Sequence, residues 1–208
     1  MRQQQKAGDK AFVDYPGKRP HVIDPSTGEV HDVELFVAVL GASNFTFAEA
    51  TRTQRIADFV RSHMNAFEYF GGVPRVAVPD QLRSAVRDPS RYEPTIARTY
   101  AELGRHYVTA IVPARPAKQR DKAKVEVAVQ IAQRWILARL RNETFFSIEA
   151  LNLRIREGLD DVNDRPVRKL GGETRRQLFE RLERAALSPL PHDRFVVSEW
   201  KRATVNVD

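Results

Sequence analysis

The order in which short apolar runs and amphipathic stretches follow one another constrains the fold of this chain more than any other feature. Runs typical of strands cover residues 10–15, 21–24 and 33–40, with no helical pattern between them. Strands without intervening helices favour antiparallel hairpins, whereas later strand–helix alternation favours parallel crossovers. The order therefore predicts an α/β protein with a mixed five-stranded sheet flanked by helices.

The second half of the predicted sheet alternates with helices. An apolar repeat at every third or fourth residue predicts a helix over 54–70, and Gly71-Gly72 ends it. Segment 46–51 either extends the sheet or begins that helix. The remaining predicted elements are strands at 73–79 and 108–112 and helices at 95–107, 123–140, 148–159 and 174–186. On the long helix, Trp135 follows Ile131 and Val127 at helical spacing, which predicts a core position.

Composition excludes several classes of protein. The 208 residues include no cysteine, which excludes disulfides, thiolate zinc sites and a catalytic thiol. The longest apolar run, at 35–42, is far shorter than the roughly 20 residues that cross a bilayer. The first residues contain no apolar stretch of the signal-peptide kind. We therefore expect a soluble cytoplasmic protein without a membrane partner.

Positive charge is concentrated in one window. Residues 115–141 contain eight Lys or Arg and two Asp or Glu, whereas the rest of the chain contains 26 basic and 25 acidic residues. A local positive field in a nearly neutral protein indicates a polyanionic partner. A solvated helix with flexible lysines is the alternative, and charge alone does not distinguish DNA from RNA or from an acidic protein.

Three carboxylates stand where a purely structural role is costly. Asp14 interrupts an apolar strand, Asp80 follows a strand at the carboxyl edge of the predicted sheet, and Glu126 begins the polar stripe of the long helix. Each has an ordinary alternative: a lysine partner for Asp14, a helix cap for Asp80, and an ion pair with Lys122 for Glu126.

Carboxylates from separate elements also suit metal-assisted phosphoryl transfer. Magnesium prefers carboxylate oxygen and water, and two ions roughly 3.5–4 Å apart stabilise the attacking and leaving oxygens. A carboxylate trio beside a positive segment is what cutting or joining a DNA strand requires.

Three blocks carry a family resemblance. Phe12-Val-Asp14-Tyr-Pro-Gly17, Val78-Pro-Asp80-Gln-Leu-Arg-Ser-Ala-Val86 and Arg120-Asp-Lys-Ala-Lys-Val-Glu126 resemble the active-site blocks of DDE transposases with an RNase H-like fold. More narrowly, they look like the IstA type, which works with a separate AAA+ helper ATPase. The second block departs from the family's usual Pro-Asp-Asn-Leu-Lys at Gln81 and Arg83.

The resemblance implies a site, a cofactor and partners. Asp14, Asp80 and Glu126 would be the catalytic and metal-binding triad for two Mg²⁺ ions, with Mn²⁺ as a substitute. Transposon-end and target DNA, a helper ATPase and further copies of the protein would be its partners, at the bacterial nucleoid. We expect four basic residues ahead of Glu126 to contact the DNA backbone: Lys118, Arg120, Lys122 and Lys124.

The resemblance also implies a domain division: a flexible arm at 1–9, the catalytic domain at 10–145, a helical extension at 146–190 and the start of a truncated C-terminal β-barrel at 191–208. The expected activity is cleavage of transposon ends followed by transfer of the 3′-hydroxyls into target DNA. The rivals are an RNase H-like nuclease that only hydrolyses, and a DNA-binding or assembly module with a structural carboxylate trio.

Overall fold

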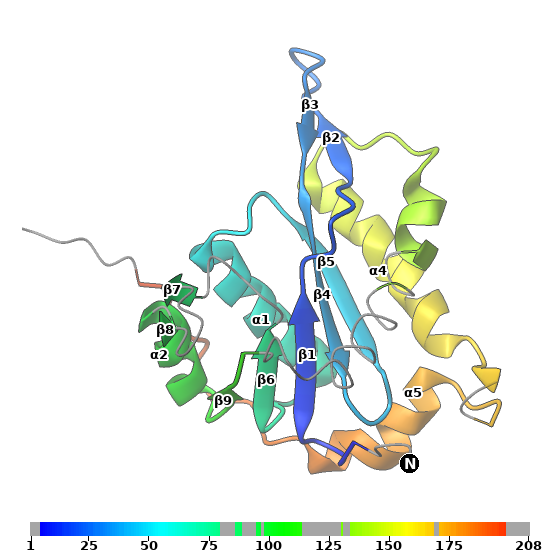
Figure 1. Cartoon of the computed structure of the whole chain (residues 1–208). Helices are drawn as coiled ribbons and strands as arrows, with labels where there is room; N and C mark the ends of the chain where they lie inside the picture. Colours follow the sequence, from blue (N-terminus) through cyan, green and yellow to red (C-terminus); the bar gives the residue numbers. More distant parts are fainter. Residues whose placement is uncertain are drawn as a thin grey trace, which may run out of the picture.

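A five-stranded mixed sheet forms the centre of the molecule (Figure 1). The computed structural model describes residues 5–79, 98–113, 130, 134–168 and 171–198, and the backbone of 86–88 and 95–96. The strands of the sheet are β1 (Lys10–Asp14), β4 (Glu34–Leu40), β5 (Thr46–Thr51), β6 (Val76–Pro79) and β9 (Ala110–Ile111).

The strands lie in the order β5-β4-β1-β6-β9, with β1 at the centre. Strands β1, β4 and β5 pair antiparallel, whereas β6 runs parallel to β1 and β9 runs parallel to β6. The predicted mixed α/β sheet is therefore confirmed, including its change from hairpins to parallel crossovers.

One predicted strand of the leading three was assigned to the wrong sheet. Residues 21–24 do form a strand, β2 (His21–Ile23), but it pairs with β3 (Val30–Asp32) in a separate hairpin. The third antiparallel strand of the central sheet is β5, from the segment whose role the sequence left open. A further short pair joins β7 (Val86–Asp88) to β8 (Thr95–Ile96).

Helices cover the sheet and its edge (Figure 1). They are α1 (Ile56–Phe70), α2 (Arg98–His106), α4 (Ile148–Asp164), α5 (Arg175–Leu178), the π-helix η2 (Phe179–Glu183) and the 3₁₀-helix η3 (Arg184–Ala186). Residues 130 and 134–140 are also helical. Helix α1 ends, as predicted, at Gly71, which adopts a left-handed φ of 67° that favours glycine. No described helix is long and apolar enough to cross a membrane.

The core between the sheet and α1 is aromatic and contains one buried histidine. Phe36 of β4 packs edge-on against Phe59 of α1, with ring centroids 6.0 Å apart. Beside them, His63 Nδ1 lies 2.8 Å from the carbonyl oxygen of Phe59, and His63 Nε2 lies 2.9 Å from the hydroxyl of Tyr100. Burial lowers the pKa of His63 to about 4, so the ring is neutral and bridges α1 to α2.

Helix α4 protects the edge of the sheet by means of two asparagines. The Asn163 amide accepts a hydrogen bond from the Thr46 N–H and donates to the Thr46 carbonyl. Asn152, three helical turns earlier, makes the same pair of bonds with Ala50. Both amides replace the neighbouring strand that β5 lacks, so outward backbone groups of this edge strand are satisfied.

A buried carboxylate attaches the last helical segment to the sheet. Glu183 is fully buried and accepts hydrogen bonds from the backbone N–H groups of Ala42 and Ser43 and from the Ser43 hydroxyl. The helical extension thus shares the core of the sheet. The predicted domain boundaries at 9/10, 145/146 and 190/191 stay predictions.

The predicted core position of Trp135 is wrong. Its side chain is 38% exposed, and the guanidinium carbon of Arg165 lies 3.6 Å from its ring centroid. Ile136, the next residue, is buried instead. An arginine stacked on the indole replaces the apolar neighbours that the helical spacing predicted.

Candidate active site

Asp14 ends β1, the central strand of the sheet. Its neighbours Val13 and Tyr15 are buried at 1% and 8% exposure, while Asp14 itself is half-buried. Because side chains alternate along a strand, the carboxylate lies on the opposite face from Val13. Asp14 is therefore held on a rigid element and still reaches the carboxyl edge of the sheet.

The strands on either side bring further segments to this edge. Asp14 is paired with Val37 of β4, and Val13 is paired with Pro79, the last residue of β6. Because β1 and β6 are parallel, their carboxyl ends meet at the same edge, where ligands of α/β proteins collect.

Tyr15 fixes the backbone that follows Asp14. Its ring packs edge-on against Phe36 with centroids 5.6 Å apart, and the Thr51 hydroxyl donates to its phenolic oxygen over 3.3 Å. Burial raises the pKa of Tyr15, so the phenol stays neutral. The residue therefore positions its neighbour rather than acting as an acid or base.

Only one member of the predicted triad falls within the described residues. Asp80 and Glu126 lie outside them, and so do all four predicted DNA contacts: Lys118, Arg120, Lys122 and Lys124. In the part of the chain that the structure describes, no three His, Asp or Glu side chains are grouped to hold a metal ion.

Other carboxylates of the sheet and α1 have structural partners. Glu34 lies 2.8 Å from an Arg19 guanidinium nitrogen and accepts from the Gln54 amide over 2.8 Å. Glu49 accepts from the Asn65 amide at 2.8 and 3.1 Å, and burial raises the pKa of Glu49. These contacts explain both side chains without a ligand.

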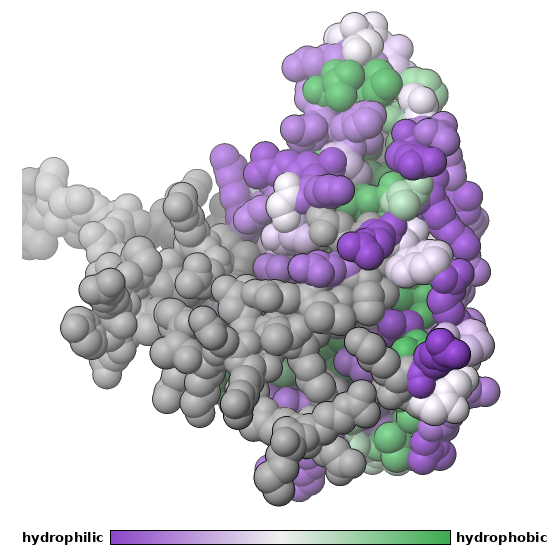
Figure 2. Space-filling view, turned by 45° about the vertical axis from the view of Figure 1, so that its right-hand side comes forward, coloured by the Kyte–Doolittle hydropathy of each residue, from purple (hydrophilic) through white to green (hydrophobic). Residues whose placement is uncertain are grey.

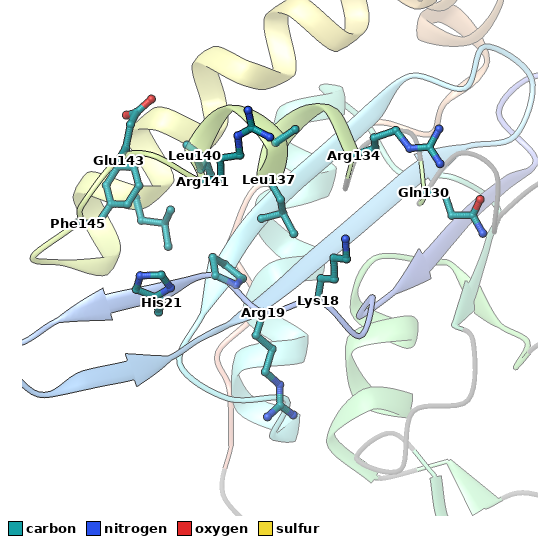
Figure 3. A pocket seen from close by; sticks show the side chains of 13 residues that line it. Lys18, Arg19, His21, Gln130, Arg134, Leu137, Leu140, Arg141, Glu143 and Phe145 are labelled. Carbon is teal, nitrogen blue, oxygen red and sulfur yellow. The ribbon is translucent and has the colours of Figure 1, made fainter.

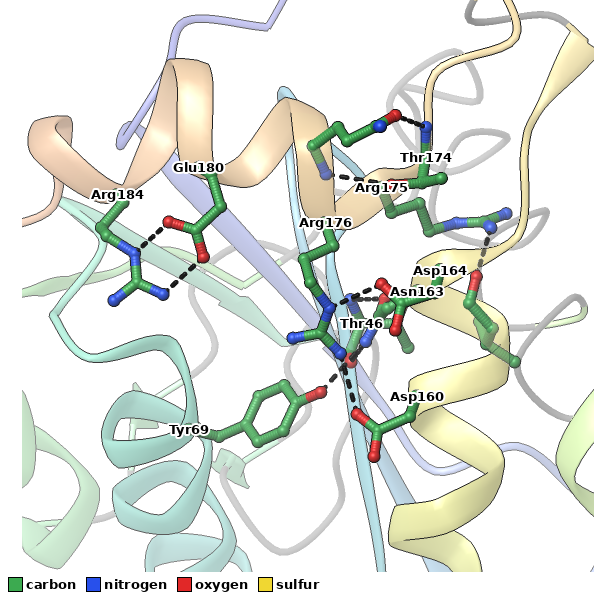
Figure 4. Close-up of polar contacts among 12 residues, drawn as sticks. Thr46, Tyr69, Asp160, Asn163, Asp164, Thr174, Arg175, Arg176, Glu180 and Arg184 are labelled. Carbon is green, nitrogen blue, oxygen red and sulfur yellow. Dashed lines mark hydrogen bonds and ion pairs between the residues drawn. The ribbon is translucent and has the colours of Figure 1, made fainter.

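The sequence analysis predicted only part of a groove whose lining begins at Lys18, four residues after Asp14. It has a volume of about 610 Å³ and lies between the chain entering β2 and the helix at 134–140 (Figure 3). Its lining includes Lys18, Arg19, His21, Gln130, Arg134, Leu137, Leu140 and Arg141. Arg134 and Arg141 belong to the basic window found in the sequence, but Lys18 and Arg19 lie more than 90 positions away, and no local pattern links them to it.

Curated relatives that match this chain are named as insertion-sequence transposases. No protein-family model matches the chain. A Pseudomonas fluorescens protein named as a transposase for insertion sequence IS1162 is 50% identical over all 208 residues, which make up 37% of that protein. A Burkholderia multivorans protein named as a transposase for IS408 is 47% identical over the whole chain and 40% of its own length. The chain is homologous to insertion-sequence transposases.

More distant relatives and solved structures agree with this homology. The IS21 transposase of Pseudomonas aeruginosa is 29% identical over 181 residues, covering 87% of this chain and 46% of that protein. The chain spans 37–40% of the length of the four curated relatives that match all of it. It is thus comparable to one portion of such a transposase.

Solved structures establish the fold of this transposase homologue. The magnesium complex of the HTLV-2 integrase catalytic core domain superposes with a TM-score of 0.58 at 14% identity, over 85% of this chain and 99% of that one. A chain of the simian T-cell lymphotropic virus intasome superposes with a TM-score of 0.62 at 14% identity, over 96% of this chain and 63% of that one. The RNase H-like fold predicted from the three blocks is confirmed.

Proposed function

We propose that this chain is the catalytic domain of a DDE transposase, with Asp14, Asp80 and Glu126 as its catalytic carboxylates. The observation that carries the proposal is the position of Asp14. It ends the central strand beside the end of β6, and Pro79 directly precedes Asp80 in the chain. Homology to insertion-sequence transposases over the full chain supports the reaction class.

The chemistry of the described residue suits a divalent cation. The Asp14 carboxylate supplies the hard oxygen that Mg²⁺ prefers, on a strand that fixes its position. Asp80 and Glu126 would complete the ligand set. Two Mg²⁺ ions, or Mn²⁺ in their place, would supply Lewis acidity to the attacking and leaving oxygens.

The proposed reaction consists of two in-line displacements at phosphorus. In the first, a water oxygen attacks and the 3′-oxygen at the transposon end leaves. In the second, that 3′-hydroxyl attacks target DNA, so a P–O bond forms as a target P–O bond breaks. Neither step needs a covalent protein intermediate. Within this chain, Tyr15 and Val13 would keep the Asp14 carboxylate in position through both steps.

The proposal extends to partners. Transposon-end DNA and target DNA would be the substrates, in the nucleoid, and several copies of the protein would assemble on paired ends. The IstA-type resemblance supports an AAA+ helper ATPase as a separate protein. Lys118, Arg120, Lys122 and Lys124 would contact the DNA backbone near the metals.

Strand joining tests the reaction class. The substrate is a labelled, pre-cut end of the element that encodes the chain, mixed with target plasmid, Mn²⁺ and the helper. We expect joined product with wild type and at least about a hundredfold less with Asp14→Asn. The substitution would remove a ligand of the metal that stabilises charge in the transition state. Asp32→Asn is the matched control, since Asp32 is an exposed aspartate of β3.

The other outcomes would support one of the two alternative functions or exclude Asp14. Nicked target without joined product, lost in Asp14→Asn, would indicate a nuclease. DNA binding that is unaffected by a chelator, with neither nicking nor joining, would indicate a binding or assembly module. Equal joining by wild type and Asp14→Asn would exclude Asp14 from the site.

A further inference from the structure

The groove of Figure 3 has an apolar floor and cationic rims. Leu140 and Leu151, at 7% and 0% exposure, close its base. Lys18 lies on the rim formed by the chain entering β2, and Arg134 lies on the opposite rim, on the helix at 134–140. A backbone hydrogen bond of 2.8 Å from the Ile23 N–H to the Phe145 carbonyl holds the two rims together.

The charge on the rims exceeds the charge available to neutralise it. Among the described lining residues, four are Lys or Arg (Lys18, Arg19, Arg134, Arg141) and one is a carboxylate, so the formal balance of this described part is 4 − 1 = +3. That carboxylate, Glu143, is already paired with Arg154, which lies outside the lining, at 2.9 Å. The groove therefore presents a positive surface to its ligand.

Adjacent residues show which cations are available. Arg19 pairs with Glu34 at 2.8 Å, and Figure 3 shows its side chain directed away from the helix. Lys18, the preceding residue, points toward the helix in the same view and has no ion pair with a described residue. On the helix, Arg139 pairs with Asp161, whereas Arg134 has no such partner among the described residues.

Lys18 lies close to Asp14 along the chain. Lys18 follows Asp14 by four residues, a span of at most about 14 Å at ~3.5 Å per residue. This distance corresponds to roughly four nucleotides at 3.4 Å per step. Arg134 lies on the turn after Gln130, whose amide also reaches the groove at the end where Lys18 lies (Figure 3). A DNA strand whose reacting phosphate reaches Asp14 would thus pass Lys18 within a few nucleotides.

We propose that this groove binds the sugar–phosphate backbone of DNA, with Lys18 and Arg134 contacting phosphates from opposite rims. The identity of the polyanion rests on the function proposed above. Lys18 and Arg134 are positioning residues: they hold the strand but do not touch the reacting atoms. Gln130, which also lines the groove, donates a hydrogen bond to the same strand.

Equilibrium binding with a chelator present tests the groove separately from catalysis. A fluorescent DNA duplex of arbitrary sequence is titrated with the 208-residue chain in EDTA, followed by anisotropy. Lys18→Ala/Arg134→Ala is compared with Arg19→Ala/Arg139→Ala, which removes the same formal charge from a neighbouring residue and from the same helix.

We expect Lys18→Ala/Arg134→Ala to weaken binding about tenfold at physiological salt and to reduce the slope of log affinity against log salt by about 1.8, or 0.9 per phosphate. The control pair removes the same formal charge but should change affinity less than about twofold, because the guanidiniums of Arg19 and Arg139 contact carboxylates and not phosphates. Equal weakening by both pairs, or none by either, would overturn the proposal. Thermal unfolding confirms that both variants fold.

A second measurement needs no variant. Acetylation of lysines in the wild-type chain, read by mass spectrometry, should slow at Lys18 when the duplex is bound and stay unchanged at exposed Lys6. Equal rates at Lys18 with and without DNA would contradict the contact. Polyglutamate that binds as tightly as DNA and protects Lys18 equally would assign the groove to an acidic protein instead.

Discussion

Two arginines on one helix show how differently the two sides of this fold use positive charge. Arg139 faces α4 and pairs with Asp161, whereas Arg134, five residues earlier, lines the groove and has no ion pair with a described residue. The pairing continues across the helical extension: Arg154 with Glu143 and Glu157, Arg176 with Asp160 and Asp164, Arg181 with Glu173, and Arg184 with Glu180.

The comparison separates formal charge from available charge. The sequence places a strong positive excess in one window, yet an arginine beside a carboxylate offers little field to a polyanion. Around the extension, polar groups satisfy one another and hold the molecule together. At the groove and at Asp14, we propose that polar groups face a ligand instead. Hydrophilic side chains cover much of the described surface in Figure 2, so surface polarity alone does not distinguish the two regions.

The largest expected effect concerns the buried carboxylate of the extension. Glu183→Ala should lower the free energy of unfolding by about 3–5 kcal/mol, because the Ala42 N–H, the Ser43 N–H and the Ser43 hydroxyl lose their acceptor. Urea denaturation measures this loss. Glu180→Ala, an exposed carboxylate paired with Arg184, should cost less than about 1 kcal/mol. Equal losses of unfolding free energy in Glu183→Ala and Glu180→Ala would contradict the distinction between a buried carboxylate and one in a surface ion pair.

The edge of the sheet should respond next. Asn163→Leu should destabilise the fold by about 2–4 kcal/mol, since the Thr46 N–H and carbonyl stay buried without partners. Asn152→Leu is the graded comparison: Asn152 is only half-buried, whereas Asn163 is fully buried, so the cost should be smaller. A larger loss at Asn152 than at Asn163 would contradict this account of the edge.

Acid should weaken the core through His63. Its pKa is about 4 in the folded protein and 6.5 in the unfolded chain, so the unfolded state binds more protons between these values. Stability is therefore lost as pH falls from 6.5 toward 4, by up to about 3 kcal/mol at 1.36 kcal/mol per pKa unit. Urea midpoints across this range should show a shallower fall in His63→Gln, with exposed His21→Gln as control. Parallel curves for wild type and His63→Gln would refute it.

The smallest effect is expected at a paired surface arginine. Arg181→Ala should change stability by less than about 1 kcal/mol, because Arg181 and Glu173 are largely exposed. Its DNA affinity should stay within about twofold of wild type, in contrast to Lys18→Ala/Arg134→Ala. Loss of DNA binding in Arg181→Ala as large as in the groove variant would show that location in the groove does not matter.

Sequence patterns predicted the sheet because its strands are dictated locally. The apolar run at 33–40 is stable only when buried, which predicts a central strand. Asp14 is conspicuous because a carboxylate in the apolar run at 10–15 is costly to bury without a partner. The strand at 21–24 was assigned to the central sheet because the sequence does not show which strands pair, and segment 46–51, which the sequence left open, forms the edge strand β5 instead.

Neither the groove nor the buried contact of Glu183 with Ser43 could be predicted from the sequence. Glu183 resembles any glutamate in an arginine-rich helix until the fold brings it to Ser43, 140 positions away. Lys18 and Arg134 are likewise united only by the packing of β2 against the chain after the long helix. The prediction for Trp135 was wrong although a local pattern supported it. Its spacing was that of a core residue, but Arg165 stacks on it at the surface.

Metal binding tests the central claim most directly. Titration of the chain with Mn²⁺, followed by the loss of the free-ion paramagnetic resonance signal, should show saturable binding by wild type and by Asp32→Asn. Asp14→Asn, Asp80→Asn and Glu126→Gln should each lower the affinity at least about tenfold, since each removes one anionic oxygen ligand. Unchanged Mn²⁺ affinity in Asp14→Asn would contradict the assignment of this strand end as the catalytic site.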